Sequence, residues 1–210
     1  MSTRTIRKLV KSDKSSFISV MSSAFAHDPL FVHLFGDPES DRKAVARANV
    51  FTAFMFDKGF LSRDEIWGSF DDGVMQGAYI LERSDVGKLR HIIGGMLQIG
   101  RFIPLLFQLP FRVITHLNSY MQITRAVAPT LQHDYLVMIG VSPDIQGKGV
   151  GRSLLDHLLY RVDKDPHSQG VALDTENAHN KALYERFGFR LTAEKLLEQL
   201  PIYCMFFKKE

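Results

Sequence analysis

The sequence predicts a mixed α/β (α+β) fold, in which a central β-sheet of about seven strands is flanked by helices. Apolar runs of strand length recur along the 210 residues, and amphipathic segments with helical spacing separate several of them. In the second half a buried strand, a glycine turn, an amphipathic helix and another strand follow one another, an order that implies a right-handed parallel crossover. The length suits one sizeable core, so we expect a single domain over residues 1–210.

The first quarter of the chain is predicted to form a strand and two helices. Residues 5–10 are the expected strand, and a helix capped at Ser12-Asp13 follows and is broken at Asp28-Pro29. Residues 31–35 are expected to form a short apolar turn. A second helix is expected from Asp41 to Phe60, with Gly59 marking its end. Its expected inward residues are Ala44, Val45, Val50, Phe51, Phe54 and Met55.

A β-hairpin is expected next. Residues 65–70 and 74–81 are two strand candidates, and the Asp71-Asp72-Gly73 sequence between them is typical of a hairpin turn. The apolar region from His91 to Leu117 is not expected to insert into a membrane, because Arg101 and Arg112 divide it into runs too short to span one.

The stretch from residue 134 to 159 organises the second half. An apolar run over residues 135–139 continues into Gly140 and Val141, which is typical of a buried strand. Alternate glycines then precede an amphipathic helix at Gly147, Gly149 and Gly151. Missing side chains let a ligand approach backbone N–H groups, and the unpaired donors of a first helical turn favour anions. With the added charge of Lys148 and Arg152, the turn is a candidate phosphate site.

The remaining segments complete the expected sheet. Residues 171–175 are a strand, and residues 177–187 are a short helix ended by Gly188. Further strands are expected at residues 189–191 and at residues 202–207, the last one antiparallel to the others.

Composition excludes some classes of function. The net charge of +3 comes without a dense Lys/Arg stripe, so no nucleic acid partner is expected. Cys204 is the single cysteine, which rules out an internal disulfide and suits a reducing compartment, so we expect a cytoplasmic protein. No signal peptide is visible. No metal is expected.

Two motifs resemble one known family. The run Val141-x-Pro143-x-x-Gln146-Gly147-x-Gly149-x-Gly151 closely resembles the acyl-CoA pyrophosphate loop of the GCN5-related N-acetyltransferase (GNAT) superfamily. The later run Asn177-x-x-Asn180-x-x-Leu183-Tyr184, followed by Gly188-Phe189, is similar to a second GNAT signature. The dinucleotide fingerprint is not matched, because Arg152 stands where it needs glycine. The Gly-x-x-x-x-Gly-Lys-Ser/Thr run of the nucleotide P-loop does not occur.

The resemblance implies acetyl-CoA as the cofactor, a sheet splayed at its centre, and acetyl transfer to an amine. The pantetheine arm would pair with the strand edge at Ile139, Gly140 and Val141, where Gly140 suggests a bulge or a close approach. The implied cofactor-binding residues are these three together with Gln146, Gly147, Lys148, Gly149, Val150, Gly151, Arg152, Ser153, Asn177, Asn180 and Tyr184. Asn177 could equally be a helix cap.

The reaction needs a neutral amine and a protonated leaving thiol. The resemblance makes Tyr184 the expected acid. For the base, Asp174 at the end of a strand is the first candidate, and His133, Asp134 or a water chain are alternatives. Positioning alone can supply much of the rate, so a dedicated base could be absent.

Roughly fifty residues separate the hairpin from the central strand, whereas the resembled family joins them almost directly. We therefore expect an insertion at 84–131, partly helical, that influences substrate choice. The expected activity is N-acetylation of a primary amine of a small molecule. Alternatives are a protein or peptide N-acetyltransferase and a non-catalytic acyl-CoA sensor. The acceptor and the oligomeric state, a homodimer included, stay open.

Overall fold

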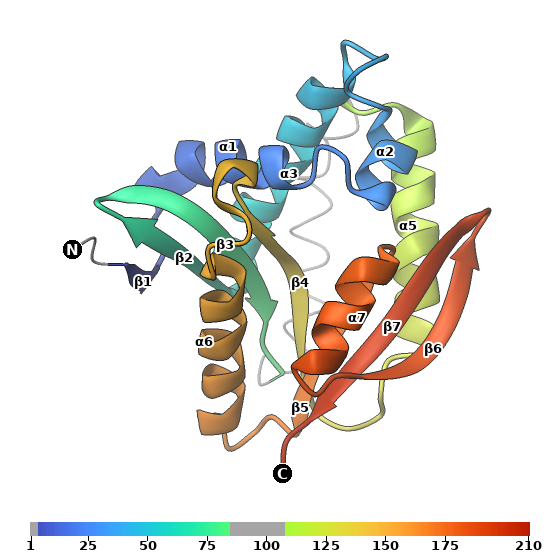
Figure 1. The fold of residues 1–210 in the computed structure, drawn as a ribbon. Coiled ribbons are helices and arrows are strands. Elements are labelled where there is room, and N and C mark those ends of the chain that lie inside the picture. The colour runs from blue at the N-terminus through green and yellow to red at the C-terminus, as the bar shows by residue number, and fades with distance from the viewer. Residues whose placement is uncertain (1–3, 85–107) are drawn as a thin grey trace.

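The computed structural model describes residues 4–84 and 108–210. Its centre is a seven-stranded sheet in the order β1-β2-β3-β4-β5-β7-β6, drawn in Figure 1. Only β4 and β5 pair in parallel, and the other neighbours are antiparallel. The strands are β1 Thr5–Lys8, β2 Glu65–Asp71, β3 Val74–Glu82, β4 Asp134–Val141, β5 Gly170–Thr175, β6 Arg190–Leu197 and β7 Leu200–Lys208. The expected mixed fold is confirmed.

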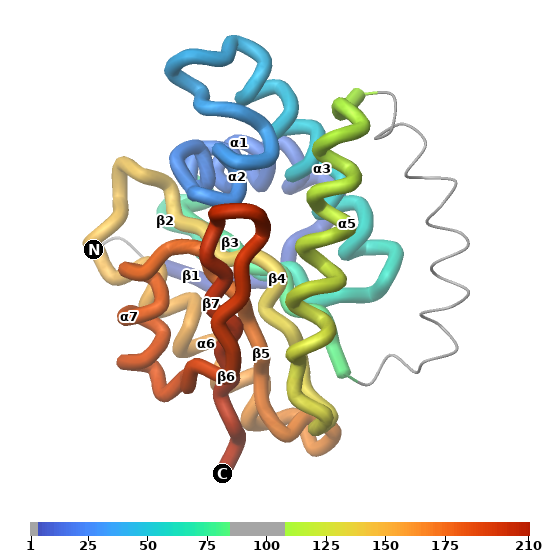
Figure 2. The backbone as a smooth tube through the Cα atoms, turned by 90° about the vertical axis from the view of Figure 1, so that its right-hand side faces the viewer, coloured from blue at the N-terminus to red at the C-terminus, as the bar shows by residue number. Residues whose placement is uncertain are grey.

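Helices cover both faces of this sheet (Figure 2). Alternate strand residues serve the two faces: Ala78 and Ile80 of β3 pack under α1 and α3, and Tyr79 and Leu81 pack under α6. The helices are α1 Lys14–Ala24, α2 Pro29–Phe35, α3 Ala44–Ser62, α5 Phe111–Ala126, α6 Val150–Lys164 and α7 Ala178–Arg186, with 3-10 turns at Lys11–Asp13 and Pro143–Ile145.

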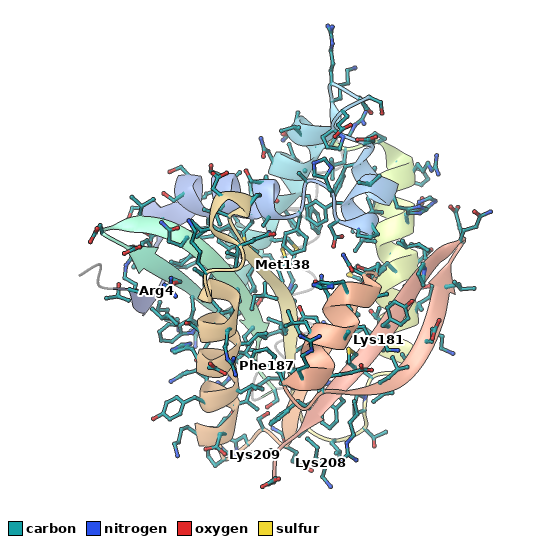
Figure 3. The ribbon with its side chains drawn as sticks, viewed as in Figure 1. Arg4, Met138, Lys181, Phe187, Lys208 and Lys209 are labelled. Carbon is teal, nitrogen blue, oxygen red and sulfur yellow. The ribbon has the colours of Figure 1, made fainter. Side chains whose placement is uncertain are left out.

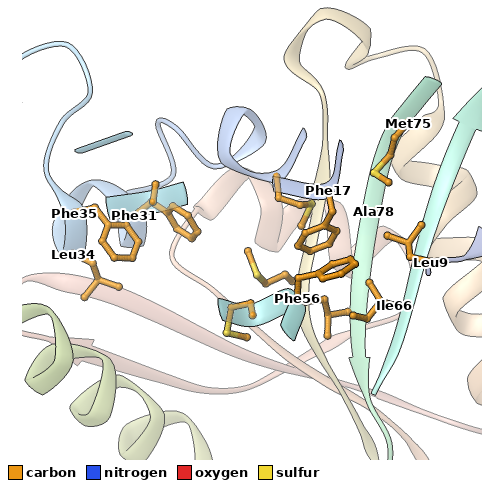
Figure 4. Close-up of a cluster of buried hydrophobic side chains, with 14 of the residues drawn as sticks. Leu9, Phe17, Phe31, Leu34, Phe35, Phe56, Ile66, Met75 and Ala78 are labelled. Atoms are coloured by element: carbon orange, nitrogen blue, oxygen red, sulfur yellow. The ribbon is translucent and has the colours of Figure 1, made fainter. Parts of the chain in front are cut away.

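An aromatic cluster fills the core on the α1 and α3 side (Figure 4). Phe17 of α1 and Phe56 of α3 lie with ring centroids 5.0 Å apart, over Ile66 of β2. Rings at this spacing contribute about 0.5–1.5 kcal/mol beyond the area that they bury. The cluster therefore fixes the helices of the first half against the central strands.

Asp28 and Pro29 begin a helix as well as ending one. The Asp28 carboxylate accepts hydrogen bonds from the N–H groups of Leu30 (3.0 Å) and Phe31 (3.3 Å), and Pro29 occupies the first helical turn. This cap stabilises α2, so the expectation of a short turn at residues 31–35 was wrong. Asp-Pro marks a helix boundary, but both of its sides can be helical.

Helix α3 runs past Gly59 to Ser62, so the expected end at Gly59 was wrong. A Cβ at Gly59 would lie 2.7 Å from Cδ1 of Ile66, which shows that this glycine serves close packing of α3 on β2. The left-handed residue that ends the helix is Arg63, with φ of 61°. Val45, expected to face inward, is 51% exposed.

The sheet opens between β4 and β5. These strands pair only at Asp134 with Val171 and at Tyr135 with Ala172, after which they diverge. The register of β3 against β4 shifts between Ile80 and Leu81, which leaves Val137 as an extra residue in β4. The bulge therefore lies at Val137, and Gly140 instead serves a close approach, because a Cβ there would be 2.9 Å from Cβ of Ala24.

The hairpin, the insertion and the membrane expectation can each be compared with the described residues. The hairpin of β2 and β3 is confirmed, with Asp72 and Gly73 both at positive φ. Of the expected insertion, α5 is helical, and residues 85–107 lie outside the described part of the chain. Across residues 4–84 and 108–210, no helix has both the length and the apolar character needed to cross a membrane.

Candidate active site

The glycine turn after β4 presents backbone donors to open space. Gly147 and Gly149 have φ of 79° and 80°, and Gly149 occupies the cap position of α6. A Cβ at Gly147 would meet nothing within 4 Å. Since the first-turn N–H groups of a helix have no partner within the helix, the turn offers several donors at the positive end of α6. A diphosphate suits this site.

Positive side chains surround the same turn. Lys148 and Arg152 are exposed, and Arg152 lies 6.0 Å from the ring of Phe187 at the end of α7. Arg4 donates a hydrogen bond to the carbonyl oxygen of Lys148 (3.3 Å), and Figure 3 labels both Arg4 and Phe187. Sequence reasoning missed Arg4, because nothing local connects it with a turn 144 residues later.

The backbone next to the turn has the free edge that the sequence predicts. Ile139, Gly140 and Val141 pair with β3 on one side, whereas the pairing of β4 with β5 stops at Tyr135. Gln146 donates to the carbonyl oxygen of Val141 (3.2 Å), and the Ser153 hydroxyl donates to that of Gly149 (3.1 Å). Because β5 does not pair with residues 139–141, this edge can receive an extended amide-rich arm as an added strand.

We expect Gly147→Ala to weaken coenzyme A binding by at least about tenfold, because its methyl group occupies the space for the phosphates. The left-handed φ adds a folding cost of roughly 1–2 kcal/mol. Gly73→Ala is the matched control, since Gly73 has the same φ of 79° and equally open surroundings, but in the β2–β3 turn. Calorimetric titration and thermal melting of both variants check this. Equal affinities in the two variants would remove the turn from the cofactor site.

Asn177 is the N-cap of α7. Its Oδ1 atom accepts hydrogen bonds from the N–H groups of His179 (2.8 Å) and Asn180 (3.4 Å). The capping alternative raised by the sequence is therefore realised, while a cofactor contact from the rest of the amide stays a prediction. Asn180 is half-buried in the first turn of the helix.

Two substitutions separate these roles of Asn177. Asn177→Ala should lower the free energy of unfolding by about 1 kcal/mol through loss of the cap, and Asn177→Ser should restore most of it. If the Nδ2 group also binds the cofactor, Asn177→Ser should keep its stability and still bind coenzyme A more weakly. Thermal melting and calorimetric titration of both variants measure the two effects. Wild-type affinity in Asn177→Ser would leave Asn177 a cap alone.

Tyr184 projects from α7 into the interior. It is 8% exposed, and its ring lies 5.7 Å from that of Phe189. Burial raises the pKa of its hydroxyl above the ordinary value, with smaller contributions from the charges of Asp174, Asp28 and Glu176. Tyr184 therefore stays protonated at neutral pH and has a proton to donate.

Asp174 lies on the opposite face, among tyrosines. Tyr120 of α5 and Tyr135 of β4 both direct their hydroxyl groups at its carboxylate, and Tyr120 also contacts Glu176. Burial raises the pKa of Asp174, against the opposing effect of the two hydroxyls. Tyr184 packs with the cluster on the α6 face of the sheet, whereas Asp174 contacts Tyr120 of α5.

Glu176 is an acidic residue that sequence reasoning missed. Burial, with the nearby charge of Asp174, raises the pKa of this 8% exposed carboxyl to about 8. The Tyr120 hydroxyl has one proton for two carboxyl partners, so a protonated Glu176 can donate to the Tyr120 oxygen while Tyr120 donates to Asp174. Its place two residues after Asp174 was the available clue.

The alternative bases lie elsewhere. Asp134 stands where β4 and β5 are still paired, and it accepts from the N–H of Ser84 (2.8 Å) beside Arg83. His133 contacts the carbonyl oxygen of Leu131 (2.6 Å) and the ring of Phe206. Neither contacts the group formed by Asp174, Glu176 and Tyr120.

Comparisons with known proteins point to one family. The sequence profile of the Acetyltransferase (GNAT) domain matches residues 119–191, which include β4, the glycine turn, β5 and Tyr184. Over these residues the chain matches the GNAT acetyltransferase family. It is therefore an acyl-CoA-dependent acetyltransferase, with both sequence motifs inside the matched region.

Individual GNAT relatives are distant. A Schizosaccharomyces pombe protein named as an uncharacterized N-acetyltransferase is 21% identical over 195 residues, which cover 87% of this chain and 73% of that protein. A Corynebacterium glutamicum structure described as histone acetyltransferase HPA2 and related acetyltransferase has a TM-score of 0.70 and 21% identity, covering 100% and 98% of the two chains.

Some structural neighbours were solved with coenzyme A or acetyl-CoA. The PaiA N-acetyltransferase of Thermoplasma acidophilum, solved with coenzyme A, has a TM-score of 0.59 and 14% identity, covering 98% of this chain and 99% of that one. These likenesses establish the GNAT fold. The roles of the individual site residues remain predictions.

Proposed function

We propose that this GNAT protein moves the acetyl group of acetyl-CoA to a primary amine of a small molecule, by direct attack of the amine on the thioester. The observation that carries the proposal is the opening between β4 and β5. It has a phosphate-binding turn at one end, and Tyr184 and the Asp174–Glu176 pair approach it from opposite faces. Protonation of the leaving thiolate and deprotonation of the amine then take place on opposite sides of the sheet.

The acidic character of the second face supports an amine as acceptor. Asp28 caps the helix α2, and its charge also contributes to raising the pKa values of Glu176 and Tyr184. A group of carboxyls in a partly buried site attracts a cationic ammonium group and orients it before it loses its proton. We therefore propose that the amine enters from the side of α2 and α5.

The proposed chemistry uses the groups in sequence. The turn from Gly147 to Arg152 binds the diphosphate and aims the thioester along the free edge of β4. The Asp174–Glu176 pair accepts the proton that the amine loses, directly or through a water molecule. The amine nitrogen forms its bond to the acetyl carbon, the carbon–sulfur bond breaks, and Tyr184 protonates the leaving thiolate.

We also propose a domain organisation and a cellular compartment. Residues 1–210 form one domain, with 84–131 as an insertion whose helix α5 supplies Tyr120 to the acceptor side. The cytoplasm is the proposed compartment, because it supplies acetyl-CoA and keeps a thiol such as that of Cys204 reduced.

Release of free thiol from acetyl-CoA tests the function directly. The full chain is incubated with a panel of small primary amines, and with peptides carrying free N-termini or lysines, while free thiol is followed by absorbance. We expect turnover with members of the small-amine set. Turnover with peptides alone would favour a protein acetyltransferase. Coenzyme A binding without turnover on any acceptor would favour the sensor.

A further inference from the structure

A group of potential metal ligands lies apart from the reaction centre. His33 of α2, His116 of α5 and Glu198 in the turn between β6 and β7 each offer one ligand atom, and these atoms all lie within 4.8 Å of one another. The tip of the β6–β7 hairpin lies near α2 and α5 in both Figure 1 and Figure 2. We propose that these three side chains form a binding site for a divalent transition metal ion of the Zn²⁺ type.

Each imidazole nitrogen lies close to ligand–ligand distance from a different carboxylate oxygen of Glu198. Nε2 of His33 is 3.6 Å from Oε2 of Glu198, and Nε2 of His116 is 3.4 Å from Oε1 of the same residue. Two atoms that each lie about 2.0–2.1 Å from a tetrahedral Zn²⁺ are about 3.3–3.4 Å apart. Small side-chain shifts therefore suffice to admit the ion.

The two imidazole rings lie side by side. They stack with centroids 5.2 Å apart and an interplanar angle of 17°. The Nε2 atom of His33 is buried and has no hydrogen-bond partner among the described residues, which is costly for a polar atom unless something binds it.

The ligand set is that of an open site. Two histidines and one carboxylate leave the fourth tetrahedral position for water. The Glu198 side chain is 53% exposed, so the ion has a path in from solvent, whereas the histidines are 19% and 17% exposed. Imidazole nitrogen combined with carboxylate oxygen suits Zn²⁺ better than Mg²⁺ or Ca²⁺, which prefer oxygen alone.

The ion would clamp three elements that border the acceptor side. His116 lies one helical turn before Tyr120, which contacts Asp174 and Glu176. His33 lies in α2, which Asp28 caps. No local motif reveals this site, because residues 33, 116 and 198 come from separate elements and become neighbours only in the folded chain.

Binding of Zn²⁺ alone, without acetyl-CoA or acceptor, tests the site independently of the proposed reaction. The full chain is freed of metal with a chelator and titrated with Zn²⁺, and with Co²⁺ as an absorbance probe. We expect one ion per chain, a Co²⁺ spectrum of a four-coordinate site, and a rise in Tm. His33→Ala and His116→Ala should weaken binding by more than about tenfold. His167→Ala, at an exposed histidine remote from the group, should bind as the wild type does.

Glu198→Gln keeps the proposal testable if a histidine variant fails to fold, since its side chain is largely exposed. It should stay folded and also bind Zn²⁺ more than about tenfold more weakly. Absence of Zn²⁺ binding by the wild-type chain, or equal affinity in the wild type, in Glu198→Gln and in every folded histidine variant, would overturn the proposal.

Discussion

Tyr184→Phe lowers kcat for acetyl transfer by roughly 10²-fold while coenzyme A affinity stays within about twofold, if the hydroxyl protonates the leaving thiolate. The phenyl ring keeps the contact with Phe189, so the packing of α7 is unchanged. What disappears is a donor whose pKa burial raises, and which therefore keeps its proton through the physiological range. Steady-state kinetics and calorimetric titration measure the two quantities.

Tyr160→Phe provides the matched control for this substitution. Tyr160 is 60% exposed on α6, so removing its hydroxyl should leave both kcat and coenzyme A affinity at wild-type values. Wild-type turnover in Tyr184→Phe would exclude Tyr184 as the acid. Loss of turnover together with loss of coenzyme A binding would make its hydroxyl part of the cofactor site instead.

Glu176→Gln should have its largest effect on turnover at high pH. Because burial raises the pKa of Glu176 to about 8, the wild-type carboxyl is mostly neutral at pH 6, and glutamine resembles that neutral form. Above pH 8 the wild-type pair can accept a proton and the variant cannot. We expect kcat ratios near one at pH 6 and roughly 10²-fold above pH 8. The apparent pKa belongs to the coupled Asp174–Glu176 pair.

The acceptor amine also titrates, and amines of different basicity distinguish its effect. An activity limb due to Glu176 stays at the same pH for each amine, whereas a limb due to the acceptor moves with the pKa of the amine. Glu194→Gln, at an exposed position of β6, should keep the wild-type profile. A pH-independent ratio between wild type and Glu176→Gln would show that this carboxyl takes no part in proton transfer.

The same carboxyl makes stability depend on pH. Folded Glu176 holds its proton up to about pH 8, whereas the unfolded chain releases it near pH 4.5. Between these values the unfolded state binds fewer protons, so this group makes the free energy of unfolding fall as pH rises. Glu176→Gln should flatten that decline. Urea unfolding from pH 5 to pH 8 measures it, and an unchanged slope would contradict the raised pKa.

The sequence by itself determined most of the elements and the glycine turn before α6. Period-two and helical patterns are local, and so is the need for glycine at the left-handed positions Gly147 and Gly149. The Asp72-Gly73 turn fixed the hairpin for the same reason. Local rules failed at Gly59, whose neighbour Ile66 is set by tertiary packing, and at Asp28-Pro29, where one dipeptide serves two helices.

Only the tertiary structure decided which polar groups meet. Tyr120, Asp174 and Glu176 come together because α5 packs against the sheet at β6, and the pKa of Glu176 follows from burial, which sequence position does not reveal. Arg4 contacts the glycine turn, and His33 stacks on His116, although both pairs are far apart in the sequence. Backbone conformation is governed by neighbours in the chain, whereas desolvation and charge pairing depend on neighbours in space.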